Sequence, residues 1–395
     1  MAFEFLMPDT VLYGKGAFDD VGKQAARYGK KALVISDPVM DSLGIVKKCK
    51  TFLQEYGLTV VSYVGVDSEP TNVHVDEAVE ICSQNSCDVI IGLGGGSCID
   101  TAKAVAVLIP NGGVMSDYYA TDRSFTKRSL PVIAIPTTAG TGSEVTKVTV
   151  ITDTASGVKM MFSNRQLLPK VAIVDPVLTL SCPANVTAAT GMDALCHAIE
   201  AYISKRAQPI TDTLALTAID NIFSSIRRAY EKGNDENARE KMSLGSMLAG
   251  AAFSNASVTL VHGMSRPIGA LFKVPHGISN AMLLPAVLEY TKAHAKKRLA
   301  DIGRKMTNDT NVSDSELADL VIREVKQLCL DLNIPNLKTY GINETDFRRA
   351  LPKMAKDAII SGSPGNNPIV PTEEEIIALY ERCYDYDFST SNEHV

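Results

Sequence analysis

The sequence predicts two domains of different class: an α/β N-terminal domain with a doubly wound, mostly parallel sheet over residues 1–182, and an all-α domain over residues 183–395. Three observations support this prediction. Short apolar segments alternate with helical segments in the first half of the chain, which is typical of βαβ units. After Pro183 these strand-like segments nearly vanish, and a periodicity of about 3.6 residues takes over. The length of 395 residues also exceeds one ordinary core.

Several segments of the N-terminal half have the composition of buried parallel strands. They are short, continuously apolar and bounded by Gly, Pro or Asp. These segments are KALVIS (31–36), TVVSYV (59–64), DVIIGL (88–93), PVIAIP (131–136) and VAIVD (171–175). Helix-like segments such as 75–86 and 99–109 lie between them. We therefore expect these strands to form the parallel sheet of the first domain.

The C-terminal half consists of long segments with helical periodicity. They include residues 186–205, 210–232 and 236–255, and further helical segments follow. The segment DPVLTLSCPA (175–184) carries turn residues and separates the two patterns, so we place the domain boundary there.

Composition excludes several classes of protein. The net charge is −6 without a run of like charges, so we expect no nucleic-acid partner. No apolar stretch reaches the roughly 18 residues of a membrane helix, and the N-terminus lacks the pattern of a signal peptide. The eight cysteines form no CxxC pair. We expect reduced thiols in a cytoplasmic protein that binds no membrane.

A glycine-rich loop follows one predicted strand directly and opens a predicted helix. It consists of Gly94, Gly95, Gly96 and Ser97. Glycines let the backbone approach a phosphate closely, and a helix N-terminus offers free N–H groups and the positive end of its dipole. The loop therefore predicts a pyrophosphate site, although a tight turn without a ligand would have the same composition.

Two further segments could contact a dinucleotide. Asp37 ends the strand 31–36, where a carboxylate could accept from a ribose 2′-hydroxyl and repel a 2′-phosphate, which favours NAD over NADP. The alternative is a turn aspartate before Pro38. The loop 136–146 also follows a strand, and its hydroxyls could contact the cofactor. They belong to Thr137, Thr138, Thr141 and Ser143.

Four residues have the types and spacing of a transition-metal site. Asp193 and His197 are four residues apart in a helical segment, so they share one face. His262 and His276 follow fourteen residues apart. A carboxylate with two or three imidazoles suits a catalytic divalent metal, although each residue alone could be structural. Together with the glycine loop, the set predicts redox chemistry on a small alcohol or aldehyde.

These motifs, in their order and spacing, resemble the iron-containing (group III) alcohol dehydrogenase family, which includes lactaldehyde reductases and propanediol dehydrogenases. The resemblance spans nearly the whole chain: GGGSCIDTAK, PTTAGTGSEVT, VAIVDP, TAATGMDALCHAIEAYIS and VHG…PHGISNAMLLP. It implies the fold of a dehydroquinate synthase-like enzyme, with a nucleotide domain, a helical metal-binding domain and the metal between them.

The resemblance also implies residue roles. Asp193, His197, His262 and His276 would bind one divalent ion, Fe²⁺ first and Zn²⁺ as the alternative. Asp37 would select NAD, and Gly95, Gly96 and Ser97 would hold the pyrophosphate. Thr138 and Ser143 would line the cofactor site, with Lys159 in contact with the cofactor. We add Asp100, in the glycine-loop motif, to these candidates.

The chain departs from the family pattern at two positions. Where many members have a histidine four residues after the first metal histidine of the helical region, this chain has Arg266. A guanidinium suits a carboxylate, sulfonate or phosphonate, so Arg266 either contacts an anionic substrate or forms a structural ion pair. Where many members read PNP, this chain has Glu69 before Pro70. A carboxylate beside a nucleotide phosphate is unfavourable, so we expect Glu69 to point elsewhere.

We therefore predict an NAD-linked, metal-dependent dehydrogenase that transfers hydride to or from a short primary alcohol or aldehyde, or one carrying an anionic group. Two alternatives stay open: a lyase of the dehydroquinate synthase kind, and a non-catalytic nucleotide-sensing protein with a structural metal. The segment FEFLMPDTVLYG (3–14) favours a strand, and the family resemblance implies that it pairs two subunits in a homo-oligomer.

Overall fold

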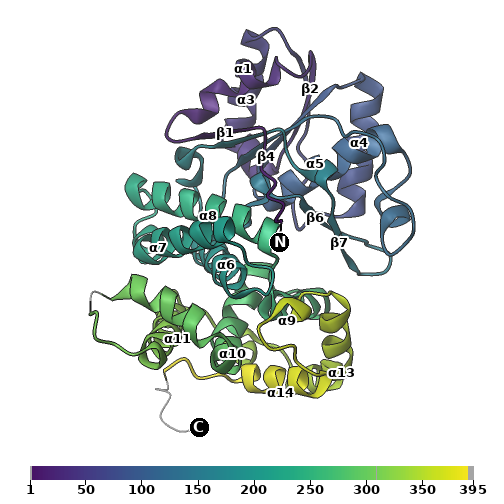
Figure 1. The fold of residues 1–395 in the computed structure, drawn as a ribbon. Helices are drawn as coiled ribbons and strands as arrows, with labels where there is room; N and C mark the ends of the chain where they lie inside the picture. The colour runs from purple at the N-terminus through teal and green to yellow at the C-terminus, as the bar shows by residue number, and fades with distance from the viewer. Residues whose placement is uncertain (1, 308, 390–395) are drawn as a thin grey trace. The chain divides into compact units, whose positions relative to one another are not determined.

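The computed structural model describes residues 2–307 and 309–389, which divide into two compact units. One unit comprises residues 5–182 and contains every strand of the described chain. The other comprises residues 183–389 together with residues 2–4 and is helical. The predicted combination of a parallel-sheet domain and a helical domain is confirmed (Figure 1).

The N-terminal unit is built on a six-stranded sheet in the order β1-β8-β5-β4-β2-β3, and all neighbouring strands pair in parallel. From one edge to the other, the strands are β1 (Thr10–Tyr13), β8 (Val171–Val174), β5 (Val132–Pro136), β4 (Val89–Gly94), β2 (Lys31–Ile35) and β3 (Thr59–Tyr63). The last five correspond to the predicted strands. Because all strands run in parallel, their carboxyl ends lie along one edge, where open α/β sheets bind ligands.

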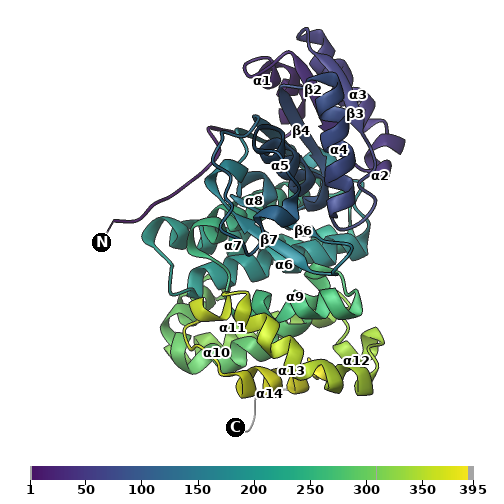
Figure 2. The same ribbon diagram turned by 90° about the vertical axis from the view of Figure 1, so that its right-hand side faces the viewer.

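Helices cover both faces of this sheet, as the alternation of side chains along β2 shows. Leu33 and Ile35 pack into a core with α4 (Asn72–Asn85) and α5 (Gly96–Asn111). Ala32 and Val34 pack into a second core with α1 (Val21–Ala25) and α3 (Ile45–Glu55). Figure 2 shows the N-terminal unit from the side on which α4 lies. Successive strand residues point to opposite faces, so a strand buried on both faces must be apolar throughout.

The sequence prediction missed a small antiparallel hairpin and overextended the first strand. The hairpin pairs β6 (Val148–Thr152) with β7 (Lys159–Ser163). Its buried residues alternate with partly buried or exposed ones, so the hairpin lacks the continuous apolar run that identified the other strands. Of residues 3–14, only Thr10–Tyr13 forms a strand, which pairs with β8 of the same chain. Pairing of this segment with another subunit stays a prediction.

The helical unit contains long helices joined by short loops. Its main helices are α6 (Ala184–Ile203), α7 (Pro209–Glu231), α8 (Glu236–Ala256), α9 (Leu260–Phe272), α10 (His276–Met306), α11 (Asp314–Asp331), α13 (Glu344–Ile360) and α14 (Glu373–Tyr384). At its N-terminus, α10 approaches α6 closely: a Cβ on Gly277 would lie only 2.3 Å from the carbonyl oxygen of Ala189. This approach is possible only because residue 277 lacks a side chain.

Within the described residues, no single helix has both the length and the apolar composition of a membrane span, although α8 and α9 meet that criterion jointly as a pair bent by 103°.

Candidate functional site

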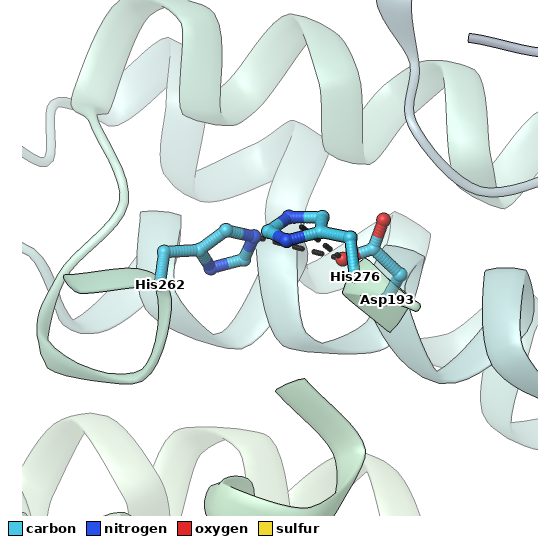
Figure 3. Close-up of side chains that lie close together, drawn as sticks. All are labelled: Asp193, His262 and His276. Atoms are coloured by element: carbon cyan, nitrogen blue, oxygen red, sulfur yellow. Dashed lines mark ion pairs between the residues drawn. The ribbon is translucent and has the colours of Figure 1, made fainter. Parts of the chain in front are cut away.

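Three helices of the C-terminal unit bring an aspartate and two histidines to one point. Asp193 lies on α6, His262 in the first turn of α9, and His276 at the first position of α10. The Oδ1 atom of Asp193 is 3.6 Å from Nε2 of His262 and 3.8 Å from Nε2 of His276. Figure 3 shows the three side chains converging. The side chain of His276 is 36% exposed, so the cluster is open on that side.

The fourth candidate, His197, contacts this cluster from one side. Its Nδ1 atom lies 3.9 Å from Oδ1 of Asp193, one helical turn away on α6. Its ring stacks on that of His262, with centroids 4.4 Å apart, and on Phe253 at 4.2 Å. All four residues predicted from the sequence are therefore neighbours, with Asp193, His262 and His276 in the tightest arrangement.

The contacts of the Asn280 amide indicate that the cluster suits a cation. Its Nδ2 atom lies 2.7 Å from Oδ1 of Asp193, 3.1 Å from Nε2 of His262 and 3.2 Å from Nε2 of His276. The partly positive NH₂ group of Asn280 thus lies close to all three candidate metal-ligand atoms, as a bound cation would. The Oδ1 atom of Asn280 is buried and has no hydrogen-bond partner among the described residues. The donor set therefore fits a divalent metal.

Charges around the cluster favour ionised carboxylates. Burial alone would raise the pKa of Asp193, but His197, His276 and His262 outweigh burial and hold its pKa well below the usual range. Burial likewise opposes ionisation of Glu200, whose pKa is nevertheless lowered by His262 and by donation from Thr259. Two buried carboxylates close together require positive partners, and a metal would supply positive charge there.

Sequence reasoning missed Asn280 and Glu200, although helical spacing carried a signal for both. Glu200 lies seven residues after Asp193 and three after His197, on the same face of α6. Asn280 follows His276 by four residues on α10.

In the N-terminal unit, the glycine loop and the loop after β5 lie side by side. Gly94 ends β4 with a φ of +149°, and Gly95 caps α5. A Cβ on Gly96 would lie 2.7 Å from Cγ2 of Thr141, and a Cβ on Gly95 would lie 3.6 Å from Thr138. No side chain caps this helix. Its first-turn N–H groups are therefore suited to an anion, as predicted for a pyrophosphate site.

The carboxylate of Asp37 lies just after the end of β2 and accepts three hydrogen bonds within the protein. Its Oδ1 accepts from the backbone N–H groups of Val39 and Met40, both at 2.9 Å, and so caps α2 (Pro38–Ser42). Its Oδ2 accepts from the thiol of Cys98 at 3.6 Å, in the first turn of α5. Asp37 is thus a turn residue that caps α2, which was the alternative to a role in cofactor binding, and it also lies next to the glycine loop. Recognition of a ribose by it stays a prediction.

Asp100 and Ser143 belong to a polar network inside the N-terminal unit. The hydroxyl of Ser143 donates to Oδ1 of Asp100 at 2.5 Å and accepts from Nζ of Lys103 at 2.8 Å. Lys103 is fully buried and also donates to Thr146 and to the carbonyl of Val148. The network ties α5 to the loop after β5, so it supports the arrangement of both loops. Direct cofactor contacts of Asp100 and Ser143 stay predictions.

Other predicted residues have partners that the sequence did not indicate. Lys159, on β7, forms an ion pair with Glu69 at 2.5 Å. Glu69 therefore neutralises the charge of Lys159, the residue that we expected to contact the cofactor. Arg266, on α9, donates to Oγ of Ser363 at 3.0 Å. Thr137 donates its backbone N–H to the carbonyl of Gly94, which joins the two loops.

A buried glutamate beside the network gives a pH-dependent prediction. Glu144 is 2% exposed, and its Oε2 atom has no hydrogen-bond partner among the described residues. Burial raises the pKa of Glu144 to about 7, above the value of about 4.3 in an unfolded chain. The folded state therefore holds this proton more tightly than the unfolded chain does. The protonated carboxyl contributes fully to the free energy of unfolding below about pH 4, and this contribution is lost as the pH rises through about 7.

We predict that Glu144→Gln raises the free energy of unfolding by about 1–3 kcal/mol at about pH 8, with little change at about pH 4. Urea denaturation at both pH values measures this difference. Glu55→Gln, at an exposed position of the same unit, serves as the control. Equal effects of Glu144→Gln at both pH values would contradict the prediction.

Comparison with known proteins adds family matches to this geometry. Residues 8–176 match the model of iron-containing alcohol dehydrogenase. Residues 187–384 match that of the C-terminal part of the Fe-containing alcohol dehydrogenase family. The 1,3-propanediol dehydrogenase of Citrobacter freundii is 38% identical over 387 residues, which cover 97% of this chain and 99% of that protein. The NAD-dependent methanol dehydrogenase of Bacillus methanolicus is 37% identical over 382 residues, covering 96% and 99%.

Solved structures show the same similarity. A 1,3-propanediol oxidoreductase superposes with a TM-score of 0.92 at 36% identity, covering 97% of this chain and 100% of the other. The sulfoacetaldehyde reductase of Bifidobacterium kashiwanohense, solved in complex with NAD⁺, superposes with a TM-score of 0.88 at 29% identity, covering 98% and 100%.

Proposed function

Because the chain belongs to the iron-containing alcohol dehydrogenase family, we propose that it interconverts short primary alcohols and aldehydes, including those that carry an anionic group. The chain is an NAD-linked alcohol oxidoreductase, as its motifs predicted. The observation that carries the proposal is the convergence of Asp193, His262 and His276 on one position.

The residues of the cluster would hold the metal in this reaction. Asp193, His197, His262 and His276 supply one carboxylate and three imidazoles, a set that suits Fe²⁺ and also Zn²⁺. When bound, a divalent cation supplies Lewis-acid chemistry that polarises an alcohol or carbonyl oxygen. The exposed side of His276 leaves room for a substrate to approach.

The N-terminal unit would hold the cofactor. The first turn of α5 offers N–H groups to the pyrophosphate, and Thr138 and Thr141 stand beside it. Asp37 is placed at the carboxyl end of β2, where a ribose hydroxyl would donate to it. These residues would hold the pyrophosphate and a ribose, while the hydride chemistry belongs to the cofactor.

Arg266 supports the proposal of an anionic substrate group. It follows His262 by one helical turn on α9 and is partly buried, and the hydroxyl of Ser363 fixes its guanidinium. A guanidinium stays protonated at neutral pH, so it cannot relay a proton as a histidine does, but it can bind a sulfonate or carboxylate. One of the similar proteins is named for a sulfonated aldehyde.

We predict that Arg266→Gln lowers kcat/KM for sulfoacetaldehyde by about 10- to 100-fold, because a hydrogen-bonded charge contact contributes about 1.5–3 kcal/mol. Turnover of propanal should change by less than about threefold, since propanal makes no such contact. Equal losses for both aldehydes would show that Arg266 is structural.

The proposed activity is tested with a panel of short alcohols and aldehydes, neutral and anionic. NAD(H) and NADP(H) are compared on iron- and zinc-loaded protein under anaerobic conditions. Net formation of NADH from a primary alcohol is the expected result. A lyase of the dehydroquinate synthase kind would return its cofactor unchanged, and a sensor would show binding without turnover.

Assembly and location are further parts of the proposal. We propose a homo-oligomer, since β1 lies at one edge of the sheet and an edge strand can pair with another chain. Light scattering of the purified protein measures this. We also propose a cytoplasmic location, because all eight cysteines are free thiols and most are buried.

A further inference from the structure

A buried glutamate lies behind the metal cluster and contacts one of its histidines. Glu200 is fully buried on α6. Its Oε2 atom forms a short hydrogen bond with Nδ1 of His262. Its Oε1 atom accepts from the hydroxyl of Thr259 and from the backbone N–H of Val261, both at 2.7 Å. Both oxygens of the carboxylate are therefore committed, and each accepts in a defined direction.

These contacts select one tautomer of His262. A carboxylate only accepts, so the shared hydrogen belongs to Nδ1, and in the neutral ring that coordinates a metal Nε2 keeps its lone pair. The other side of the ring gives an independent indication, because Nδ2 of Asn280 lies 3.1 Å from Nε2 and is a donor. The Nε2 lone pair thus points toward Asp193 and His276, where the metal would bind.

We propose that Glu200 is the positioning residue of the metal centre: it holds His262 as the Nδ1–H tautomer and fixes the ring so that Nε2 can coordinate. Glu200 contacts neither metal nor substrate in this scheme and acts only through His262. The inference rests on the proposed metal site. Partners of this kind set the orientation and basicity of a ligand, and their removal commonly lowers metal affinity by about 10- to 100-fold.

Glu200→Gln tests the proposal because it keeps the size of the side chain. Two donors, Thr259 and Val261, face the position of Oε1, so the glutamine will place its carbonyl oxygen there. Its NH₂ group then faces Nδ1 of His262, which must become an acceptor and move its hydrogen to Nε2. A protonated Nε2 cannot coordinate a metal. Glu200→Asp keeps the carboxylate and should retain the native tautomer, although it leaves a small cavity.

The first readout is the tautomer of His262 in metal-free protein, from ¹⁵N chemical shifts of the imidazole. We expect hydrogen on Nδ1 in the wild type and in Glu200→Asp, and on Nε2 in Glu200→Gln. The second readout is the Kd for Co²⁺, followed by its visible absorption. The proposal expects the Kd to rise by about 10- to 100-fold in Glu200→Gln and less in Glu200→Asp. A packing role predicts the reverse order, because only aspartate leaves a cavity.

A matched control comes from another buried carboxylate of the same unit. Glu289, on α10, accepts from Lys326 at 2.6 Å and from the hydroxyl of Tyr386 at 2.8 Å, away from the metal cluster. Glu289→Gln should lower the Tm and leave both the His262 tautomer and the Kd for Co²⁺ unchanged.

The inference would be overturned if Glu200→Gln kept the native tautomer of His262 and an unchanged Kd for Co²⁺. If Glu200→Gln does not fold, an altered tautomer of His262 in Glu200→Asp would overturn it instead. Wild-type protein that binds Co²⁺ with the expected tautomer but oxidises no alcohol would contradict the proposed function and leave this inference supported.

Discussion

Replacing His276 with alanine is expected to remove the bound metal and to lower kcat for alcohol oxidation by at least about 1,000-fold. The imidazole is one of three groups whose ligand atoms converge, and its Nε2 lies 3.8 Å from Oδ1 of Asp193. Loss of a Lewis acid removes several kcal/mol of transition-state stabilisation, and each 1.36 kcal/mol is a factor of ten in rate. Metal analysis and steady-state kinetics on the same sample measure both effects.

The comparison of His276→Ala with His262→Ala separates metal loss from unfolding. The side chain of His276 is 36% exposed, so its removal should change the free energy of unfolding little. His262 is buried, and its loss would leave the carboxylate of Glu200 without its histidine partner at a cost of about 3–5 kcal/mol. His294→Ala, exposed on the same helix α10, should change neither metal content nor rate. Full turnover by a metal-free His276→Ala protein would contradict the assignment.

Gly95→Asp is expected to weaken NAD⁺ binding by at least about 100-fold while the fold is retained. The backbone of Gly95 has φ −68° and ψ −176°, which any residue adopts, and a Cβ there meets Thr138 at an ordinary 3.6 Å. Aspartate is a favourable N-cap, so α5 should form at least as well. Its charge would stand where the pyrophosphate is expected, and like charges about 4 Å apart repel by about 4 kcal/mol at an effective dielectric of 20.

Gly95→Ser is the matched variant for this experiment, because serine caps the helix without a charge. NADH binding by fluorescence and the Tm of both variants give the required comparison. We expect a Tm equal to or above that of the wild type for both, with a large loss of affinity only for aspartate. Affinity within about threefold of the wild type in Gly95→Asp would place the pyrophosphate elsewhere.

Much of the fold follows from local patterns. Strands such as β4 are apolar throughout because parallel strands are covered on both faces, and this pattern identified five of them. The hairpin of β6 and β7 escaped prediction because one-sided burial gives short, mixed sequences.

For the candidate site, spacing on one helix face relates Asp193 to His197, since residues four apart are neighbours. Periodicity does not extend to His262 or His276, which lie on other helices.

Local sequence patterns were enough to predict the two fold classes, the glycine loop at a strand-to-helix junction, and the residue types that can ligate a metal. These features are local, because a helix or strand is recognised from the spacing of apolar residues within one or two turns of the chain. The partners that complete each site depend instead on how distant parts of the chain pack together. Glu200 meets His262 across 62 residues of chain, and Lys103 meets Ser143 across 40. Such contacts arise from the packing of whole elements, so the spacing that puts Glu200 on the same face of α6 as Asp193 does not identify His262 as its partner.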